Sequence, residues 1–245
     1  MTVRFTQSNG IARIVLDDPA RRNALGWGTL EAILDSVNSA QDDDARCIVL
    51  SAQGSVFSAG ADFNDLTGTA ADTHFDDAVS KVTTAFRSSS IPVVAVVDGP
   101  CLGAAVDVVT STDVVIATQS ARFEVPAARL GILYNPDSLV AMHSRITGSL
   151  MRTLMLGISV SADEALAGGL VSKVVDPTEL EVEVQRVTEK LGAAVGGAIG
   201  ATKGLIRSLD EGTFDRAYWQ QVRLNFLDST ERLEIINSRK RPSPL

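Results

Sequence analysis

The chain is poor in the residue types that build disulfide frameworks and metal sites. Its 245 residues include only two cysteines and two histidines, and aromatic residues make up 5%. Two cysteines cannot form a disulfide framework in a chain of this length, and no metal-ligand spacing is present. Cys47 and Cys101 each lie in or beside an apolar run. We therefore expect both thiols to be small buried hydrophobic groups and expect no metal site.

Basic residues are also in deficit. Lysine and arginine number 22 against 30 aspartate and glutamate residues, so the formal net charge is −8. A nucleic-acid partner requires a basic face, and this balance argues against one. An anionic small ligand stays possible, because a few local lysine or arginine side chains can hold a phosphate whatever the net charge.

Long apolar runs are missing as well. A membrane-spanning helix needs about 20 consecutive apolar residues, and no run reaches that length. The first residues, Met1 to Phe5, lack the charged-then-apolar pattern of a secretory signal. The content of 45% hydrophobic and 21% charged residues is ordinary for a globular protein. We therefore expect a cytoplasmic protein with no membrane partner.

What the sequence does contain is a regular alternation of strand and helix patterns. Asn9-Gly10 between two apolar runs is a strong hairpin signal. Strand patterns then alternate with helical ones up to residue 175, and the remainder is helical. The order predicts an α/β protein with a helical C-terminal appendage. We place a core domain at 1–190 and the helical region at 191–245.

Two of the predicted strands run into turns of small residues. Phe57-Ser58-Ala59-Gly60-Ala61-Asp62 follows the strand at 46–51, and Asp98 to Ala105 follows the strand at 93–97. Small residues let a backbone approach a ligand closely, and Asp62 could cap a helix. Two such turns side by side could aim two backbone N–H groups at one carbonyl oxygen, as an oxyanion hole requires. Tight packing is the alternative explanation, and spacing alone does not show that the turns meet.

Three blocks of the sequence resemble the signature blocks of the crotonase (enoyl-CoA hydratase/isomerase) superfamily. They are FSAGAD at 57–62, DGPCLGAA at 98–105 and ARFEVPAARLGI at 121–132. The resemblance extends over nearly the whole chain, from LDDP at 16–19 to GGLV at 168–171. It implies a crotonase (ClpP-like) fold of repeated ββα units whose C-terminal helices form a trimerisation region. It also implies a homotrimer or a hexamer (a dimer of trimers).

The same resemblance implies an acyl-CoA or enoyl-CoA substrate whose coenzyme A takes the place of a separate cofactor. The backbone N–H groups of Ala61 and Ala104 would form the oxyanion hole, although most relatives have glycine at the second position. The remaining substrate-binding candidates that it suggests are Ala24, Ala59, Gly60, Asp62, Gly103, Ala127 and Tyr134. For the phosphates and pantetheine, the candidates are Arg21, Arg22, Lys203 and the cluster Arg239-Lys240-Arg241, all of which could instead be simply solvated.

The acid/base positions are where this sequence departs from the family. Classical hydratases use two glutamates, one to position and deprotonate water and one to deliver the proton. The first position is Asp107 here, which is shorter by one methylene, and the second is Ala127, which can transfer no proton. The segment after Leu133, which forms one wall of the pocket in the family, also departs from the family pattern. In it, Tyr134 could donate a hydrogen bond or line the acyl tunnel, and Asp137 is either catalytic or the N-cap of a helix.

Three hypotheses remain. The first is an enzyme with hydratase/isomerase-type chemistry on a 2-enoyl-CoA thioester and an altered acid/base pair. The second is a non-catalytic acyl-CoA carrier with the same fold, which the missing proton donor at Ala127 favours. The third is a scaffold without a ligand, against which the three intact blocks argue. His143 falls among apolar residues of a predicted helix, so we expect it in the core or at an interface rather than in catalysis.

Overall fold

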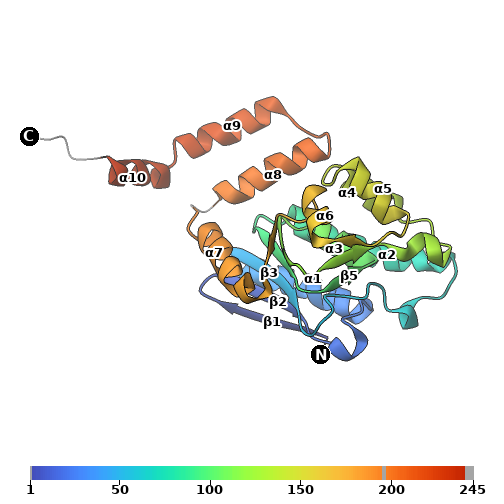
Figure 1. Cartoon of the computed structure of the whole chain (residues 1–245). Coiled ribbons are helices and arrows are strands. Elements are labelled where there is room, and N and C mark those ends of the chain that lie inside the picture. Colours follow the sequence, from blue (N-terminus) through green and yellow to red (C-terminus); the bar gives the residue numbers. More distant parts are fainter. Residues whose placement is uncertain (1, 195–196, 241–245) are drawn as a thin grey trace, which may run out of the picture.

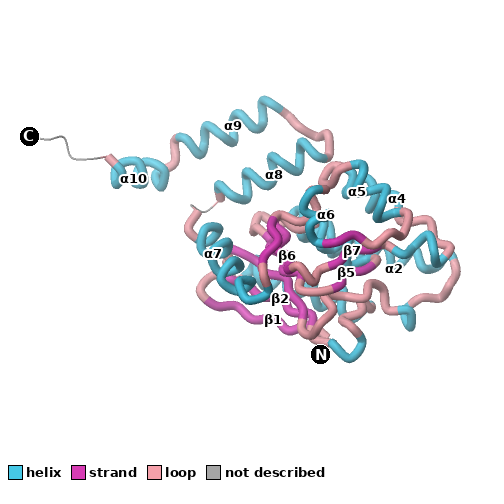
Figure 2. Tube along the Cα trace, in the orientation of Figure 1, coloured by secondary structure: helices cyan, strands magenta, loops and turns pink. Residues whose placement is uncertain are grey.

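A computed structural model describes residues 2–194 and 197–240. It contains a six-stranded sheet with the order β1-β2-β3-β4-β6-β9 (Figure 1 and Figure 2). The strands are β1 Val3–Ser8, β2 Ile11–Leu16, β3 Cys47–Ala52, β4 Val93–Val97, β6 Val114–Thr118 and β9 Lys173–Val175. Only the β1–β2 pair is antiparallel, and the other four pairs are parallel. The turn between β1 and β2 places Asn9 at φ 53° and Gly10 at φ 75°, the left-handed conformations that a tight hairpin needs.

The protein also contains a second, smaller sheet. It has the order β5-β7-β8, with β5 Pro100–Leu102, β7 Arg122–Glu124 and β8 Val160–Ser161. β5 and β7 run parallel, and β8 joins β7 antiparallel. Because β5 belongs to the second predicted block and β7 to the third, this sheet brings two of the three blocks together.

The large sheet is covered on both faces, as a parallel sheet requires. On one face, Ile48, Leu50 and Ala95 join the main core, which includes side chains from α1, α2 and α3. On the other face, Cys47, Val49 and Val94 pack with residues of α7. The alternation follows the two-residue period of a strand. The helices are α1 Trp27–Asp42, α2 Thr73–Ser88, α3 Ala104–Thr110, α4 Pro136–His143, α5 Gly148–Met155, α6 Ala162–Ala167 and α7 Leu180–Gly192.

The C-terminal helices extend away from the two sheets (Figure 1). They are α8 Ala198–Asp210, α9 Arg216–Leu227 and α10 Thr230–Arg239. Ser208 is the one buried residue of α8, and α9 and α10 contain none. The α/β core with a C-terminal helical region is thus confirmed, while trimerisation stays a prediction. The predicted domain boundary at 190/191 falls in the last turn of α7, and it also stays a prediction.

Two smaller expectations are also confirmed. The spacing of Ser161 and Glu164 in the sequence predicts a capping box, and the two residues form one at the start of α6. Cys47 and Cys101 are buried free thiols, and burial raises the pKa of Cys47 to about 12. In the part of the chain that the structure describes, no helix is both long and apolar enough to span a bilayer.

Candidate active site

The two turns of small residues meet in the structure. The Phe57 N–H donates to Pro100 O at 3.0 Å, and the Leu102 N–H donates to Ser58 O at 2.9 Å. Gly60 has φ +86°, and a Cβ on it would lie 2.6 Å from Leu102 O. No residue with a side chain could therefore occupy this position without shifting the second turn. The glycine brings the two turns to van der Waals distance, so close packing and convergence occur together.

A buried asparagine holds the first turn in place. Asn23 is 2% exposed, and its amide donates to Gln53 O and Val56 O, both at 2.8 Å. Its carbonyl accepts from the Asp18 N–H, so all of its side-chain polar atoms have partners. The Ser58 hydroxyl donates to the Asn23 backbone oxygen at 2.7 Å and accepts from the Gly60 N–H at 3.1 Å. These bonds fix the path of the backbone up to Gly60.

The Ala61 N–H is left without an acceptor by the local pairing. Leu25 brackets it, because the Leu25 N–H donates to Gly60 O at 2.7 Å and the Asp62 N–H donates to Leu25 O at 3.0 Å. Ala104 is the first residue of α3, where an N–H has no intrahelical acceptor. Within residues 2–194 and 197–240, neither N–H donates a hydrogen bond to the protein. Two adjacent turns thus offer two unused backbone donors.

Ala104 fits its position without strain. Gly103, one residue earlier, takes the left-handed φ of +55°, while Ala104 begins the helix. The alanine methyl group therefore does not distort the turn.

Asp107 lies one turn further along α3 and is only 3% exposed. Burial raises the pKa of its carboxyl group above the usual range. The negative charge of Asp76 adds to this rise, while the Ser138 side chain and the positive charge of Arg87 oppose it. A carboxyl group with a raised pKa close to unused N–H donors is typical of a proton-transfer site.

Tyr134 faces the same region and is half-buried against the main core. Burial raises the pKa of its phenol well above the usual range, and the negative charges of Asp107 and Asp76 raise it further. The phenol is therefore neutral and can donate a hydrogen bond. Ala127 also packs on the core and contributes only a methyl group.

Comparison with known proteins gives the same family as the three sequence blocks. The sequence model of the family described as enoyl-CoA hydratase/isomerase matches residues 6–222. The chain belongs to this family. Its members bind acyl-CoA substrates. The chain is 30% identical to the mitochondrial enoyl-CoA hydratase domain-containing protein 3 of Rattus norvegicus, over 96% of this chain and 82% of that protein.

Two further likenesses support the family and the fold. The mouse (Mus musculus) protein of the same name is 32% identical over 76% of this chain. The match covers 64% of the mouse protein, just under two thirds. The solved structure of the human enoyl-CoA hydratase domain-containing protein 3 superposes with a TM-score of 0.88 at 27% identity, covering all of both chains. The crotonase fold expected from the three blocks is therefore confirmed.

Asp62 has a structural role at this crotonase-type site. Its carboxylate caps the 3-10 turn Phe63–Asp65 by accepting from the Asn64 N–H at 3.0 Å, as its place in the block predicted. It also pairs with Arg21 at 3.1 Å, and Arg21 pairs with Asp18 at 2.7 Å. The side chain of Asp62 is therefore used within the protein, as are its backbone N–H, which donates to Leu25 O, and its carbonyl, which accepts from the Asp65 N–H at 3.0 Å. Ala24 and Ala59 lie in the same segment, where the Ala59 N–H donates to Arg22 O at 2.9 Å.

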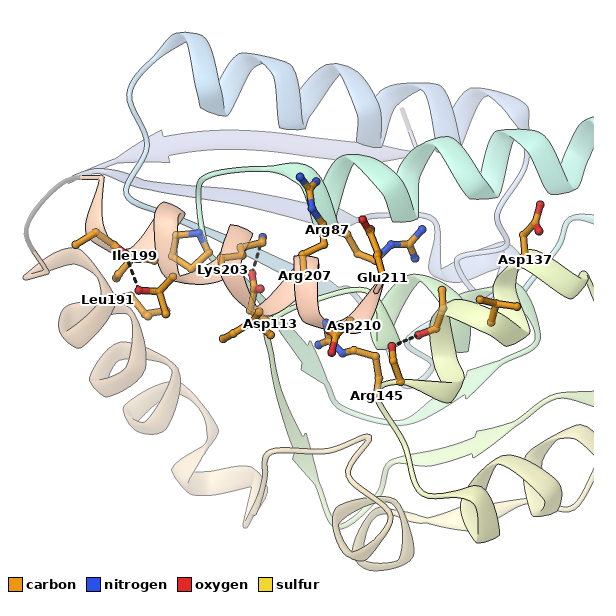
Figure 3. A pocket seen from close by; sticks show the side chains of 17 residues that line it. Arg87, Asp113, Asp137, Arg145, Leu191, Ile199, Lys203, Arg207, Asp210 and Glu211 are labelled. Atoms are coloured by element: carbon orange, nitrogen blue, oxygen red, sulfur yellow. Dashed lines mark hydrogen bonds and ion pairs between the residues drawn. The ribbon is translucent and has the colours of Figure 1, made fainter. Parts of the chain in front are cut away.

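Asp137 lies on α4, whereas Asp107 lies on α3. The N-cap of α4 is Asn135 and not Asp137, the residue considered for that role. The Asn135 Oδ1 accepts a hydrogen bond from the Asp137 N–H at 2.9 Å. Asp137 is exposed and lines a cavity of about 780 Å³ between α4 and α8 (Figure 3). Ala61, Ala104 and Asp107 do not line this cavity. The structure therefore gives Asp137 neither the N-cap role nor a place beside the oxyanion turns.

Two further expectations are wrong. Lys203 does not reach out for phosphates. Its Nζ donates to Phe86 O at 2.7 Å, Ile91 O at 3.1 Å and Asp113 Oδ2 at 2.7 Å, which joins α8 to the core (Figure 3). The core alternative for His143 is wrong, because this residue is exposed at the end of α4, while its place at an interface stays a prediction. In the C-terminal basic cluster, Arg239 ends α10, Lys240 follows it, and Arg241 lies outside the described residues.

The structure also shows an acid that the sequence analysis missed. Asp76 is half-buried on α2, and its charge acts on both Asp107 and Tyr134. A signal was present in the sequence, because Asp76, Ser80, Thr83 and Arg87 have helical spacing. This polar stripe runs directly beside the apolar one on α2.

Proposed function

We propose that this chain is an enzyme that acts on the thioester of a 2-enoyl-CoA by hydratase/isomerase-type chemistry. The observation that carries the proposal is the pair of unused N–H groups on Ala61 and Ala104 at two touching turns, with the buried Asp107 one helical turn away. In this arrangement the two N–H groups bind the thioester oxygen. They stabilise the enolate-like oxyanion, at about 3 kcal/mol for each donor.

Asp107 exchanges a proton with the bound substrate or with the water that adds to it. Its raised pKa suits this task, because a catalytic group works best when its pKa lies near the operating pH. The aspartate is shorter than glutamate by one methylene, so the acyl group must lie closer to α3 than with a glutamate. Tyr134, on which the charge of Asp107 acts, supplies a neutral hydrogen-bond donor. No cofactor beyond the substrate's coenzyme A enters this proposal.

Turnover of a short and a long 2-enoyl-CoA tests the proposal, followed by loss of the conjugated enoyl-thioester absorbance. We expect Asp107→Asn to lower turnover by about 10²–10⁴-fold while acyl-CoA binding, measured by calorimetry, is kept. Asp137→Asn is the matched control, because this acid lies on the separate cavity, and it should turn over like the wild type.

Ala127 favours a second candidate function, a non-catalytic acyl-CoA carrier, because a methyl group stands where a proton donor is needed. Tight acyl-CoA binding without turnover by the wild type would support the carrier. Failure to bind any acyl-CoA would contradict both candidates and leave the scaffold hypothesis.

A homotrimer, alone or paired into a hexamer, is the assembly that we propose. The support is that α9 and α10 have no buried residue, although Tyr218, Leu224 and Leu233 lie on them exposed. Light scattering of the purified protein tests this. The cytoplasmic location stays a prediction, and the rat and mouse relatives, whose names call them mitochondrial, do not support it.

A further inference from the structure

Helix α2 presents two stripes to the protein rather than one. The apolar stripe is buried and consists of Phe75, Val79, Val82 and Phe86. The residue that follows each of these apolar residues is polar or charged, and together these residues form a polar stripe that consists of Asp76, Ser80, Thr83 and Arg87. Thr83 is buried and the other three are half-buried. The polar stripe therefore faces the interior, where a helix surface normally carries apolar residues.

Asp107 lies opposite this polar stripe. α2 packs against α3, which carries Asp107. The charges of both end residues of the stripe, Asp76 and Arg87, act on the Asp107 carboxyl group. Eleven residues of helix separate these ends by about 16 Å. An acid at one end of the stripe and a base at the other therefore both act on Asp107.

The Asp76 end of the stripe lies on the oxyanion side of the site. Phe75, the residue before it, packs edge-on against Trp27, with ring centroids 5.9 Å apart and an interplanar angle of 80°. Trp27 begins α1 two residues after Leu25, the residue that brackets the Ala61 N–H. The first turn of α2 thus contacts the start of α1, next to the Ala61 turn, and its Asp76 acts on Asp107 and Tyr134.

The environment makes Asp76 and Asp107 unequal. Burial raises the pKa of both carboxyl groups, but Asp107 is buried and Asp76 only half-buried. Burial therefore disfavours the charged form of Asp107 more than that of Asp76, and the charge of Asp76 raises the pKa of Asp107 and of Tyr134. The charged groups that act on this pair are Asp72, Asp77 and Arg87, the Ser138 side chain hydrogen-bonds to Asp107, and both carboxyl groups in turn act on Tyr134. The titrations of the two carboxyl groups are therefore coupled through this charge.

We propose that Asp76 is the second carboxyl group of the reaction and takes over the task for which Ala127 has no side chain. This inference rests on the proposed function. Ionised Asp76 accepts a proton from the water whose oxygen bonds to C3 of the 2-enoyl thioester. The electron pair of the double bond moves to the thioester oxygen, which Ala61 and Ala104 hold, and it returns as C2 takes a proton from Asp107.

The step balances, because one water is added across the double bond and one proton has passed from Asp107 to Asp76. Return of that proton to Asp107, through the Tyr134 hydroxyl or solvent, restores the starting state. The roles are exchanged relative to the family pattern, where the residue at position 107 deprotonates water. The reason is depth, since the more buried carboxyl group keeps its proton.

Three variants test the proposal. Asp76→Asn keeps the shape and removes the acid, Asp76→Glu keeps the acid, and Asp77→Asn changes the exposed neighbour. We expect Asp76→Asn to lose about 10²–10⁴-fold in turnover at unchanged acyl-CoA affinity, and to lose the acidic limb of the pH profile. Asp76→Glu should restore most of the loss. Asp77→Asn should keep full turnover, with the acidic limb moved to lower pH, because the Asp77 charge raises the pKa of Asp76.

Wild-type turnover in Asp76→Asn, or loss of turnover through loss of acyl-CoA binding, would overturn the inference and leave the proposed function standing. If the wild type binds acyl-CoA but turns over no 2-enoyl-CoA, the proposed function fails separately. Carboxyl ¹³C NMR titration of the acyl-CoA complex then decides about the pair. Coupled titration of two carboxyl groups that reduces to one simple curve at lower pH in Asp76→Asn supports a shared proton, whereas independent curves overturn it.

Discussion

The two halves of the site are built from different material. The oxyanion half uses backbone N–H groups of Ala61 and Ala104, held by glycines and by the buried amide of Asn23. The acid/base half uses the side chains of Asp107 and Tyr134, together with Asp76 in our inference. The first half matches the family blocks closely, and the second departs from them.

The difference follows from what each half has to supply. A backbone donor is the same in every residue except proline, so alanine can replace glycine at 104 wherever φ allows it. A proton donor depends on a particular side chain, and none can act from Ala127. That group must come from another element, and α2 is the element that brings an acid close to Asp107. Substitutions in the two halves should therefore have different consequences.

The largest combined effect is expected from Gly60→Ala. The new Cβ would lie 2.6 Å from Leu102 O at a φ of +86°, which costs about 1–3 kcal/mol and pushes the turns apart. Loss of one donor alone lowers turnover by about 10²–10³-fold. Thermal unfolding and turnover measure the two effects. Gly68→Ala is the control, because Gly68 also has a positive φ, +70°, but no atom lies within 4 Å of the added Cβ. This variant should lose about 1 kcal/mol of unfolding free energy and keep its full turnover. Equal turnover in both variants would contradict the convergence of the turns.

Asn23→Ala is expected to come next. It removes the donors to Gln53 O and Val56 O and the acceptor for the Asp18 N–H, so buried backbone groups lose their partners. We expect a loss of about 2–4 kcal/mol of unfolding free energy, measured by urea denaturation. The exposed Asn38 on α1 provides the control, since Asn38→Ala should change stability by no more than about 0.5 kcal/mol. A stable Asn23→Ala variant would show that the first turn holds its shape without this amide.

Asp107→Asn should have the opposite effect on stability. The folded-state pKa of Asp107 lies above its unfolded value, so the native state binds the proton more tightly. Stability is therefore lost as pH rises from the unfolded pKa through the folded one, and no such loss occurs at lower pH. The variant should unfold a few degrees higher than the wild type at pH 7 and nearly with it at pH 4. A lower melting temperature at pH 7 would mean that Arg87 and Ser138 outweigh burial.

The smallest effect is expected from Ala104→Gly, which restores the residue found in most relatives. Ala104 already begins a helix with Gly103 in the left-handed conformation, so its methyl group imposes no strain. Turnover should stay within about twofold, because the donor is the unchanged backbone N–H. A tenfold change in either direction would show that the methyl group itself contacts the acyl chain.

The sequence predicted the elements well where periodicity was clear. The hairpin at Asn9-Gly10 and the capping box of α6 both lie where the pattern placed them. Local signals suffice there, because turn chemistry and side-chain period act over a few residues. The sequence was less informative on Lys203, which looks like a solvated cation but binds Asp113, 90 residues away.

The sequence by itself determined the alternation of strands and helices, the two turns of small residues and the family to which they belong. These depend on local conformational preference and on spacing along the chain. Only the tertiary structure decided that the turns touch, that Asp137 faces a different cavity and that Asp76 acts on Asp107. Contact between distant segments depends on how helices pack on the sheet, and the pKa of an acid depends on the burial and charges that this packing creates.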